Sequence, residues 1–489
     1  MNPALHGDAP LLDALGRMLE SPPSPFGIPG HKLDKGIDPA VRSILGERVF
    51  ACDVSLDGQL DDRLATHGYD KRAEELIADA ISADEVLLST NGSTLAAEAA
   101  ILGMAGPGDT ILMTRGMHKS AVSALILGGA TPVFLDPGYD DEQQLWHPVP
   151  VATLEAAVRA NPNACAAFVV SPSSYGFTAD IEGLAGVCHR AGIPLIVDEA
   201  WGVHLAFSER LPVSALAAGA DVAVTSMHKQ GTGLMQGSII GIRKGRVDVI
   251  RLQQAVAMLE SSSTSMLILA AVDGARRQFA LRGEQLLSHA VDLAMSLRDG
   301  AAHIEGLRVL GDEMVGRPGV HAFDPTKVVI DVSGLDVSAF AVIDWLLEQH
   351  RMPCEMADDR HLVAMVTVAD DDRSIGRLVD ALAELPRAAA ALRGAKRMTV
   401  PAPQALRTEL AMSPREAYFD GRRPVSLQEA AGSIAAETAV PYPPGIPAIL
   451  PGEVWTEALI DFLKSGVDCG MKVADAADPK LGTVLVVDR

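Results

Sequence analysis

Basic side chains are in the minority in this chain, and no segment of it is strongly basic. The 489 residues include 41 Lys and Arg against 63 Asp and Glu, which gives a formal net charge of −22. Nucleic acids and anionic membrane surfaces bind to basic patches. The charge balance therefore argues against a nucleic-acid or membrane partner, and it is compatible with a cationic substrate.

Cysteine is also scarce. The five cysteines are odd in number, widely spaced and without a CxxC pair: Cys52, Cys165, Cys188, Cys354 and Cys469. Disulfide frameworks and structural zinc sites need paired or closely spaced cysteines. Neither is expected here, no other metal site is indicated, and a reducing cytoplasm fits best.

Long apolar segments are missing. A membrane-spanning helix needs roughly 18 consecutive apolar residues, whereas MLILAAV at 266–272 is typical of the longest runs in this chain. The N-terminal stretch has acidic residues within its apolar part and lacks the core of a signal peptide. Because 48% of the residues are apolar, a sizeable core can form, and we expect a folded cytoplasmic protein.

Short apolar runs alternate with Ala- and Leu-rich helical segments between about residues 85 and 245. Near-continuous apolar runs are typical of strands that helices cover on both faces. The alternation predicts an α/β domain with a mostly parallel seven-stranded sheet, whose ligands bind at the carboxyl ends of the strands. The seven runs are EVLLST (85–90), DTILMT (109–114), TPVFLD (131–136), AAFVVS (166–171), PLIVDEA (194–200), DVAVTS (221–226) and GSIIGIR (237–243).

The pattern of predicted helices and strands changes in the last part of the chain. Residues 246–300 are largely helical and should lead out of the sheet domain, while residues 303–385 have the strands and helices of a compact α+β unit. The last stretch contains the Pro-rich turn PYPPGIP and the strand-like GTVLVV. The expected parts are an N-terminal segment (1–70), a large domain (71–300), an α+β small domain (301–400) and a C-terminal domain (401–489).

The segment ADVAVTSMHKQGTGLMQGSII at 220–240 places His228 and Lys229 at the end of a strand, before a glycine-rich loop. Partial desolvation at such a place lowers the pKa of a lysine, so that its free amine can form a Schiff base. A solvated loop lysine is the simpler interpretation of this segment alone. The other His–Lys pairs precede the sheet (31–32) or open a helix (118–119), so Lys229 is the candidate nucleophile.

Another strand, in PLIVDEAWGVH at 194–204, ends at Asp198. A buried carboxylate beside a pyridinium nitrogen keeps that nitrogen protonated, which makes pyridoxal phosphate an electron sink. Ala200 points the same way as Asp198 and could pack under a flat ring. The Asp–Glu pair could instead bind a metal or cap a helix.

Two further segments follow strands of the same sheet. Gly92, Ser93 and Thr94 open a helix, where backbone N–H groups, hydroxyls and the helix dipole suit a phosphate, although such residues are often only a helix cap. His118 can stack on a cofactor ring or be an ordinary surface residue. Each feature alone is weak, but the four together, each after a strand, point to a pyridoxal phosphate site.

With these motifs the chain resembles the bacterial ornithine/lysine/arginine decarboxylase family, of pyridoxal phosphate fold type I. The resemblance covers nearly the whole chain, implies an aspartate aminotransferase-like large domain with smaller α+β C-terminal domains, and is to the short members without an N-terminal wing domain. Its last two motifs are peculiar to this family among pyridoxal enzymes. The motifs are PGHK (29–32), NGST (91–94), RGMHKS (115–120), VDEAWGVH (197–204), SMHKQGTGLMQGS (226–238), DPTKVVIDVSG (324–334), MSPREAYF (412–419) and AAETAVPYPPGIPAILPGE (435–453).

The resemblance also implies roles for single residues. Lys229 would hold pyridoxal 5′-phosphate as a Schiff base, Asp198 would pair with the pyridine nitrogen, and His118 would stack on the ring. The phosphate would be held by Ser93, Thr94, Ser226 and His228. Three departures from the family pattern are the Ser–Thr order in the phosphate cup, Trp201 where short members usually have His, and an inserted residue in GQLDDRLATHG (58–68).

The activity that the resemblance implies is decarboxylation of a basic L-amino acid. Arginine is favoured over lysine and ornithine, by analogy with short members that feed agmatine into polyamine synthesis. Either Lys229 or His228 would return the proton to Cα. Glu355 resembles a family position near the active site and is the candidate acid for the distal cation, with Trp201 as a second substrate-side residue; a solvated loop acid is the alternative for Glu355.

Other interpretations stay open. An aminotransferase or β-eliminating lyase would use the same Lys229 and Asp198 but would release a keto acid and no carbon dioxide. An inactive regulatory homologue is disfavoured by the intact lysine, aspartate and phosphate cup, and a purely structural protein leaves those residues unexplained. Family members build each active site at a dimer interface, so the resemblance implies at least a homodimer, with SSSTSMLILAAVDGARR (261–277) reaching the neighbouring chain's cofactor.

Overall fold

The computed structural model describes residues 5–54, 60, 68–393, 398, 401, 403–442 and 445–489. The chain divides into two compact units. The first comprises Met1–Met104, Cys188–Glu209 and Val213–Leu287, and the second comprises Ala105–Val187, Arg210–Pro212 and Ser288–Arg489. Of the stretch 58–68, which departs from the family pattern, all but residues 60 and 68 lie outside the described residues.

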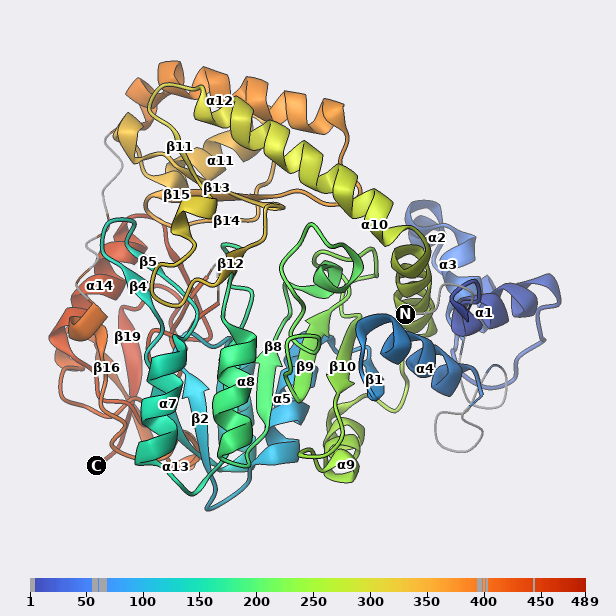
Figure 1. Cartoon of the computed structure of the whole chain (residues 1–489), viewed down its shortest axis with the longest axis horizontal. Coiled ribbons are helices and arrows are strands. Elements are labelled where there is room, and N and C mark those ends of the chain that lie inside the picture. The colour runs from blue at the N-terminus through green and yellow to red at the C-terminus, as the bar shows by residue number, and fades with distance from the viewer. Residues whose placement is uncertain are drawn as a thin grey trace. The chain divides into compact units, whose positions relative to one another are not determined.

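Four strands of a seven-stranded sheet belong to the first unit, in the order β1 (Glu85–Ser89), β10 (Ser238–Ile242), β9 (Val222–Ser226) and β8 (Leu195–Asp198). Figure 1 shows these strands side by side. β9 is parallel to β8, whereas β10 is antiparallel to both of its neighbours. β1, β8 and β9 therefore point the same way, and the residues that follow them meet at one edge.

The helices of the first unit surround these strands. Helix α5 (Gly92–Met104) follows β1 directly and is buried over most of its length. A core joins side chains of the N-terminal helices, β1 and the start of α10. The other helices of this unit are α1 (Pro10–Glu20), α2 (Pro39–Leu45), α3 (Glu47–Cys52), α4 (Tyr69–Ile81), α9 (Val249–Leu259) and the 3-10 turns η2 (Lys32–Asp34) and η3 (Val203–Phe207).

The other three strands of the sheet belong to the second unit, in the order β6 (Ala164–Val170), β2 (Thr110–Thr114) and β3 (Thr131–Leu135), all parallel. The seven predicted strands are thus confirmed, and the sheet is mostly parallel with β10 as the exception. Helices that alternate with the strands are α6 (Lys119–Gly128), α7 (Val151–Ala160) and α8 (Ile181–Arg190). Two short strand pairs join β4 (Tyr139–Asp140) to β5 (Leu145–Trp146) and β7 (Phe177–Thr178) to β12 (Ala322–Phe323).

The long helix α10 (Met266–Ala302) leads to a four-stranded antiparallel sheet, as the helical pattern of 246–300 predicts. Apolar side chains of this sheet pack against α11 and α12 in one core. Among the described helices, none combines the length and apolar character needed to cross a bilayer. The sheet order is β11 (Arg308–Leu310), β13 (Lys327–Asp331), β15 (His361–Met365) and β14 (Met356–Ala357), with α11 (Ala339–His350), α12 (Asp372–Leu392), η4 (Asp312–Met314) and η5 (Ser333–Leu335).

The last part of the chain has a core of its own, built around Trp455. Its two strand pairs are antiparallel, and the predicted strand GTVLVV is confirmed as β19. The elements are η6 (Pro403–Leu406), α13 (Pro414–Phe419), β16 (Arg422–Ser426), η7 (Leu427–Glu429), β17 (Val440–Tyr442), α14 (Glu457–Asp468), β18 (Lys472–Ala474) and β19 (Thr483–Val487).

Candidate active site

Lys229 and Trp201 lie together at the edge of the sheet in the first unit. Lys229 follows β9 and Trp201 follows β8, and these strands are adjacent and parallel. The Nζ atom of Lys229 lies 4.1 Å from the centroid of the Trp201 indole ring. A cation over an indole face is attracted by the ring quadrupole. Trp201 therefore contacts the candidate nucleophile directly.

Asp198 is the buried carboxylate of the same cluster, with only 7% of its surface exposed. Its Oδ1 accepts a hydrogen bond from the Ala200 N–H at 3.1 Å. Burial raises the pKa of Asp198 above its ordinary value, while the positive charge of Lys229 and the Ala200 N–H partly oppose that rise. The carboxylate therefore lies within electrostatic range of Lys229, in a place where a further positive charge would stabilise it.

The expected phosphate cup is joined to the end of β9. The Ser226 hydroxyl donates a hydrogen bond to Ser93 Oγ at 2.8 Å, and Ser226 is completely buried. Gly92 has φ +77°, a conformation that favours glycine, and its N–H donates to the Gln236 carbonyl at 2.8 Å. Residues far apart in the sequence thus meet at the N-terminus of α5, where Thr94 lies in the first turn.

The loop that leads into the cup is held by Glu260, the residue after α9. Its Oε1 accepts hydrogen bonds from the Thr90 N–H at 3.0 Å and from the Thr90 hydroxyl at 2.7 Å. Glu260 and the αL residue Gln236 were not identified from the sequence. A lone Glu after a helix carries no local signal for this contact, whereas the neighbouring Gly237 drew attention to the loop as a whole.

His228 is half-buried beside Lys229. Its Nδ1 lies 3.3 Å from the Gly237 carbonyl oxygen. A carbonyl only accepts, so Nδ1 carries the proton and Nε2 has the lone pair. Burial lowers the pKa of His228 below its ordinary value, and the charge of Lys229 lowers it further. The neutral imidazole is therefore favoured near neutral pH, with a basic nitrogen available.

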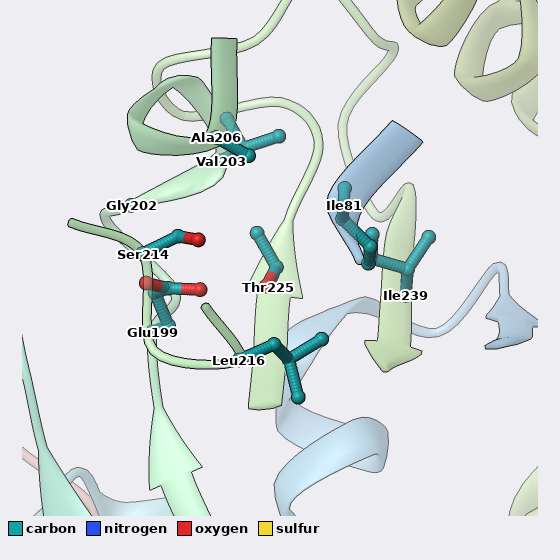
Figure 2. A pocket seen from close by; sticks show the side chains of 9 residues that line it. All are labelled: Ile81, Glu199, Gly202, Val203, Ala206, Ser214, Leu216, Thr225 and Ile239. Atoms are coloured by element: carbon teal, nitrogen blue, oxygen red, sulfur yellow. The ribbon is translucent and has the colours of Figure 1, made fainter. Parts of the chain in front are cut away.

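Glu199, next to Asp198, lines a small pocket with room for about one water molecule. Its Oε1 accepts a hydrogen bond from the Ala215 N–H at 2.6 Å, and burial raises its pKa from 4.5 to about 8. Figure 2 shows Glu199 and Ser214 facing Thr225 of β9 across this pocket. Successive residues of a strand face opposite sides, so Thr225 and the pocket lie on the other side of β9 from Ser226 and the phosphate cup.

His118 and Glu355 belong to the second unit. His118 caps α6: its Nδ1 accepts from the Ser120 N–H at 3.3 Å and lies 3.0 Å from the Ser120 hydroxyl. Glu355 is half-buried, and its N–H donates to the Val363 carbonyl at 3.0 Å. Burial, with a smaller effect of the Glu355 charge, raises the pKa of the neighbouring Cys354 to about 12.

Comparison with known proteins accounts for nearly the whole chain. Residues 9–374 match the family model for the Orn/Lys/Arg decarboxylase major domain, and residues 397–473 match that for the Orn/Lys/Arg decarboxylase C-terminal domain. The chain belongs to the Orn/Lys/Arg decarboxylase family. It is therefore a pyridoxal phosphate-dependent amino acid decarboxylase, and the predicted family, fold type and cofactor are confirmed.

Relatives of this decarboxylase match from end to end. The arginine decarboxylase of Bacillus subtilis (strain 168) is 36% identical over 98% of each chain. That of Halalkalibacterium halodurans is also 36% identical, over 98% of this chain and 97% of the relative. The constitutive lysine decarboxylase of E. coli superposes with a TM-score of 0.83, at 20% identity, over 98% of this chain and 82% of that one. The last likeness shows the shared fold.

The residues at the sheet edge of this decarboxylase fit the cofactor. Burial destabilises the charged form of Asp198 and so raises its pKa. A pyridinium N–H beside the carboxylate would compensate that charge. Ser93 and Ser226 place two hydroxyls at a helix N-terminus, the donor set that a phosphate requires. Lys229 contacts the aromatic Trp201 and interacts electrostatically with Asp198. Its amine therefore belongs to the same cluster as the carboxylate that would pair with the ring nitrogen.

Proposed function

We propose that this enzyme removes the α-carboxylate of a basic L-amino acid, with arginine as the favoured substrate and agmatine and carbon dioxide as products. The observation that carries the choice is the 36% identity to arginine decarboxylases over 98% of the chain. The lysine decarboxylases of Pseudomonas aeruginosa and Hafnia alvei are less similar, at 26% and 23% identity. Lysine and ornithine remain the next substrates to test.

The residues of the first unit support separate roles in binding the different parts of the cofactor. Bound pyridoxal phosphate supplies the electron sink for the carbanion left when the Cα–carboxylate bond breaks. Lys229 would bind its aldehyde, Asp198 would hold the proton on its ring nitrogen, and Ala200 would pack under the ring. The phosphate would accept hydrogen bonds from the hydroxyls of Ser93, Thr94 and Ser226, and His228 would complete the phosphate site.

Protonation of Cα needs a group that can hold a proton and give it up. The Nε2 of His228 carries the lone pair, because Nδ1 faces the Gly237 carbonyl, and the lowered pKa favours rapid release of a proton. Lys229 is the other candidate donor, since its side-chain ammonium can hold a proton and give it up. We propose that one of these two residues performs the step.

The remaining site roles rest on the family. His118 would stack on the cofactor ring. Glu355 would bind the distal cation of the substrate, because an unpaired cation in a pocket is costly, and Trp201 would form the wall beside Lys229.

We also propose that the enzyme is at least a homodimer. Large apolar side chains of the first unit are left strongly exposed in the single chain, among them Phe26, Ile44 and Met235. Exposed apolar groups of this kind mark protein interfaces. Light scattering on the purified protein tests this: a monomeric mass at micromolar concentration would contradict the proposal.

The cellular setting and the domain division remain proposals as well. The five cysteines, all within the described residues, form no disulfide, which suits a cytoplasmic role in polyamine biosynthesis. The division into 1–70, 71–300, 301–400 and 401–489 is supported by the separate apolar cores of the last two parts. Limited proteolysis should cut first near these boundaries.

The deciding experiment is the release of carbon dioxide from arginine, lysine and ornithine by the enzyme with added pyridoxal phosphate. Release from arginine in preference to the others is expected, together with the visible band of lysine-bound cofactor. Lys229→Ala should lose both. The visible band without release from any of the three would favour an aminotransferase or another lyase, and no band would favour an inactive homologue.

A further inference from the structure

The C-terminal domain forms hydrogen bonds to the loop that carries His118. Arg115, at the end of β2, is bound by Glu453 through two hydrogen bonds: Nε to Oε1 at 3.1 Å and Nη2 to Oε2 at 3.0 Å. The same guanidinium donates to the carbonyls of Pro447 at 2.7 Å and Ala448 at 3.1 Å. His118 follows Arg115 closely in the same loop, whereas Glu453 lies 338 positions away from Arg115.

This ion pair is more buried than an ordinary surface ion pair. Glu453 is 1% exposed and the Arg115 side chain 22%. Glu453 Oε2 also accepts from the Leu450 N–H at 3.0 Å. Planar, bidentate pairs of this kind are strong and directional, and removing one partner leaves a buried charge uncompensated. Such a pair fixes the position of the backbone that carries it.

A second contact reaches His118 itself. Gly445 has φ +88°, and a Cβ built on it would lie 3.3 Å from Cδ2 and 3.5 Å from Nε2 of the His118 ring. The bare backbone of Gly445 therefore packs against one edge of the imidazole, while Ser120 holds Nδ1 on the other. The ring is thus held at Nδ1 and flanked at its other edge by a residue without a side chain.

The same domain also binds the far end of α6. Arg415 donates from Nη1 to the carbonyls of Ile126 at 2.8 Å and Leu127 at 2.6 Å, in the last turn of the helix. Cationic side chains stabilise a helix at this end. Arg415 is exposed and lies at the opposite end of α6 from His118, so it provides a matched control: the same helix and the same domain, without a contact to the imidazole.

We propose that Arg115 and Glu453 are positioning residues for the decarboxylation, and that the C-terminal domain acts through them and Gly445 to set the orientation of the His118 imidazole. The inference rests on the proposed role of His118 as the group that stacks on the cofactor. The pair would touch neither substrate nor cofactor, and its effect would pass through the His118 ring.

A double-mutant cycle tests this. Glu453→Gln keeps the shape of the side chain but places an amide N–H against the guanidinium. With the cofactor-loaded enzyme, it should lower kcat by about tenfold to a hundredfold, the cost of a small misplacement at a reacting centre, with a shifted visible band and little change in KM. In the His118→Ala background, Glu453→Gln should change kcat by less than about twofold, because the ring it positions is gone.

The control is Arg415→Gln, which should lower the melting temperature while leaving kcat within about twofold and the visible band unchanged. If Glu453→Gln lowers kcat equally in the wild-type and His118→Ala backgrounds, the positioning role is refuted. If His118→Ala keeps the wild-type kcat and spectrum, the stacking role of His118 itself fails, which is a separate result. Should Glu453→Gln not fold, Gly445→Ala, which changes no charge and presses on the ring, takes its place in the same cycle with the same criteria.

Discussion

Glu199 is a buried glutamate whose charged form burial destabilises more than the Ala215 N–H stabilises it. Glu199→Gln should therefore make the enzyme's stability less dependent on pH. In the folded chain burial raises the pKa of Glu199 to about 8, against 4.5 as its ordinary value. Glutamine has nearly the same shape, can keep the hydrogen bond from the Ala215 N–H and does not titrate. The substitution therefore removes the proton linkage and little else.

The sign follows from proton binding. Between pH 4.5 and 8 the folded chain keeps the Glu199 proton that the unfolded chain releases, so rising pH favours unfolding in this window. The slope approaches about 1.36 kcal/mol per pH unit. From pH 5 to pH 7 the wild type should lose roughly 2 to 3 kcal/mol of unfolding free energy through this one group, a loss that the Gln variant does not have.

Urea unfolding at pH 5, 6 and 7 measures this, with wild type and variant compared at each pH so that all other titrating groups cancel. The unfolding free energy of Glu199→Gln relative to wild type should rise by roughly 2 to 3 kcal/mol from pH 5 to pH 7. Thr225→Val, which alters the same pocket without a titrating group, should differ from wild type by the same amount at every pH. A pH-independent difference for Glu199→Gln would refute the raised pKa.

Three further substitutions address the active site. Asp198→Asn should leave the cofactor bound but slow decarboxylation by orders of magnitude, because the ring nitrogen loses its anionic partner; single-turnover rates with the loaded enzyme check this, and a wild-type rate would contradict the assignment. Glu355→Gln should raise KM for arginine with a smaller effect on kcat, and an unchanged KM would return Glu355 to the role of a solvated loop acid. Ser226→Ala removes a hydroxyl that bonds Ser93 at 2.8 Å and should weaken binding of pyridoxal phosphate by about tenfold, the worth of one such hydrogen bond, measured by fluorescence titration of the apoenzyme; undiminished affinity would contradict a phosphate-binding role.

Much of the fold could be predicted because its signals are local. Each of the seven strands is a short, mostly apolar run in the structure, and runs of this length and composition are typical of strands in a covered sheet. The antiparallel direction of β10 is also explained locally. A parallel return needs a crossover of a dozen or more residues, usually a helix, whereas the segment between β9 and β10 (227–237) is a glycine-rich loop without a helix.

The candidate site was partly predictable for a topological reason. Parallel strands carry their following residues to one edge, so Asp198 and Lys229 had to meet once the order of strand and motif was known. The sequence could not show that the Trp201 ring covers the Lys229 amine, since that contact depends on the path of two loops. Nor could the sequence show which hydroxyl groups lie next to each other at the expected phosphate cup, such as those of Ser226 and Ser93.

The chain's own sequence thus determined the α/β class, the positions of the strands and the choice of residues proposed to bind the cofactor, because period, composition and order along the chain are local properties. Tertiary structure alone decided the rest. Glu199 is held neutral by burial, Glu260 supports the loop at Thr90, and Glu453 binds Arg115 across 338 positions. The burial of a charge and the partner that compensates it depend on what surrounds it in space, and no pattern of neighbouring residues records that.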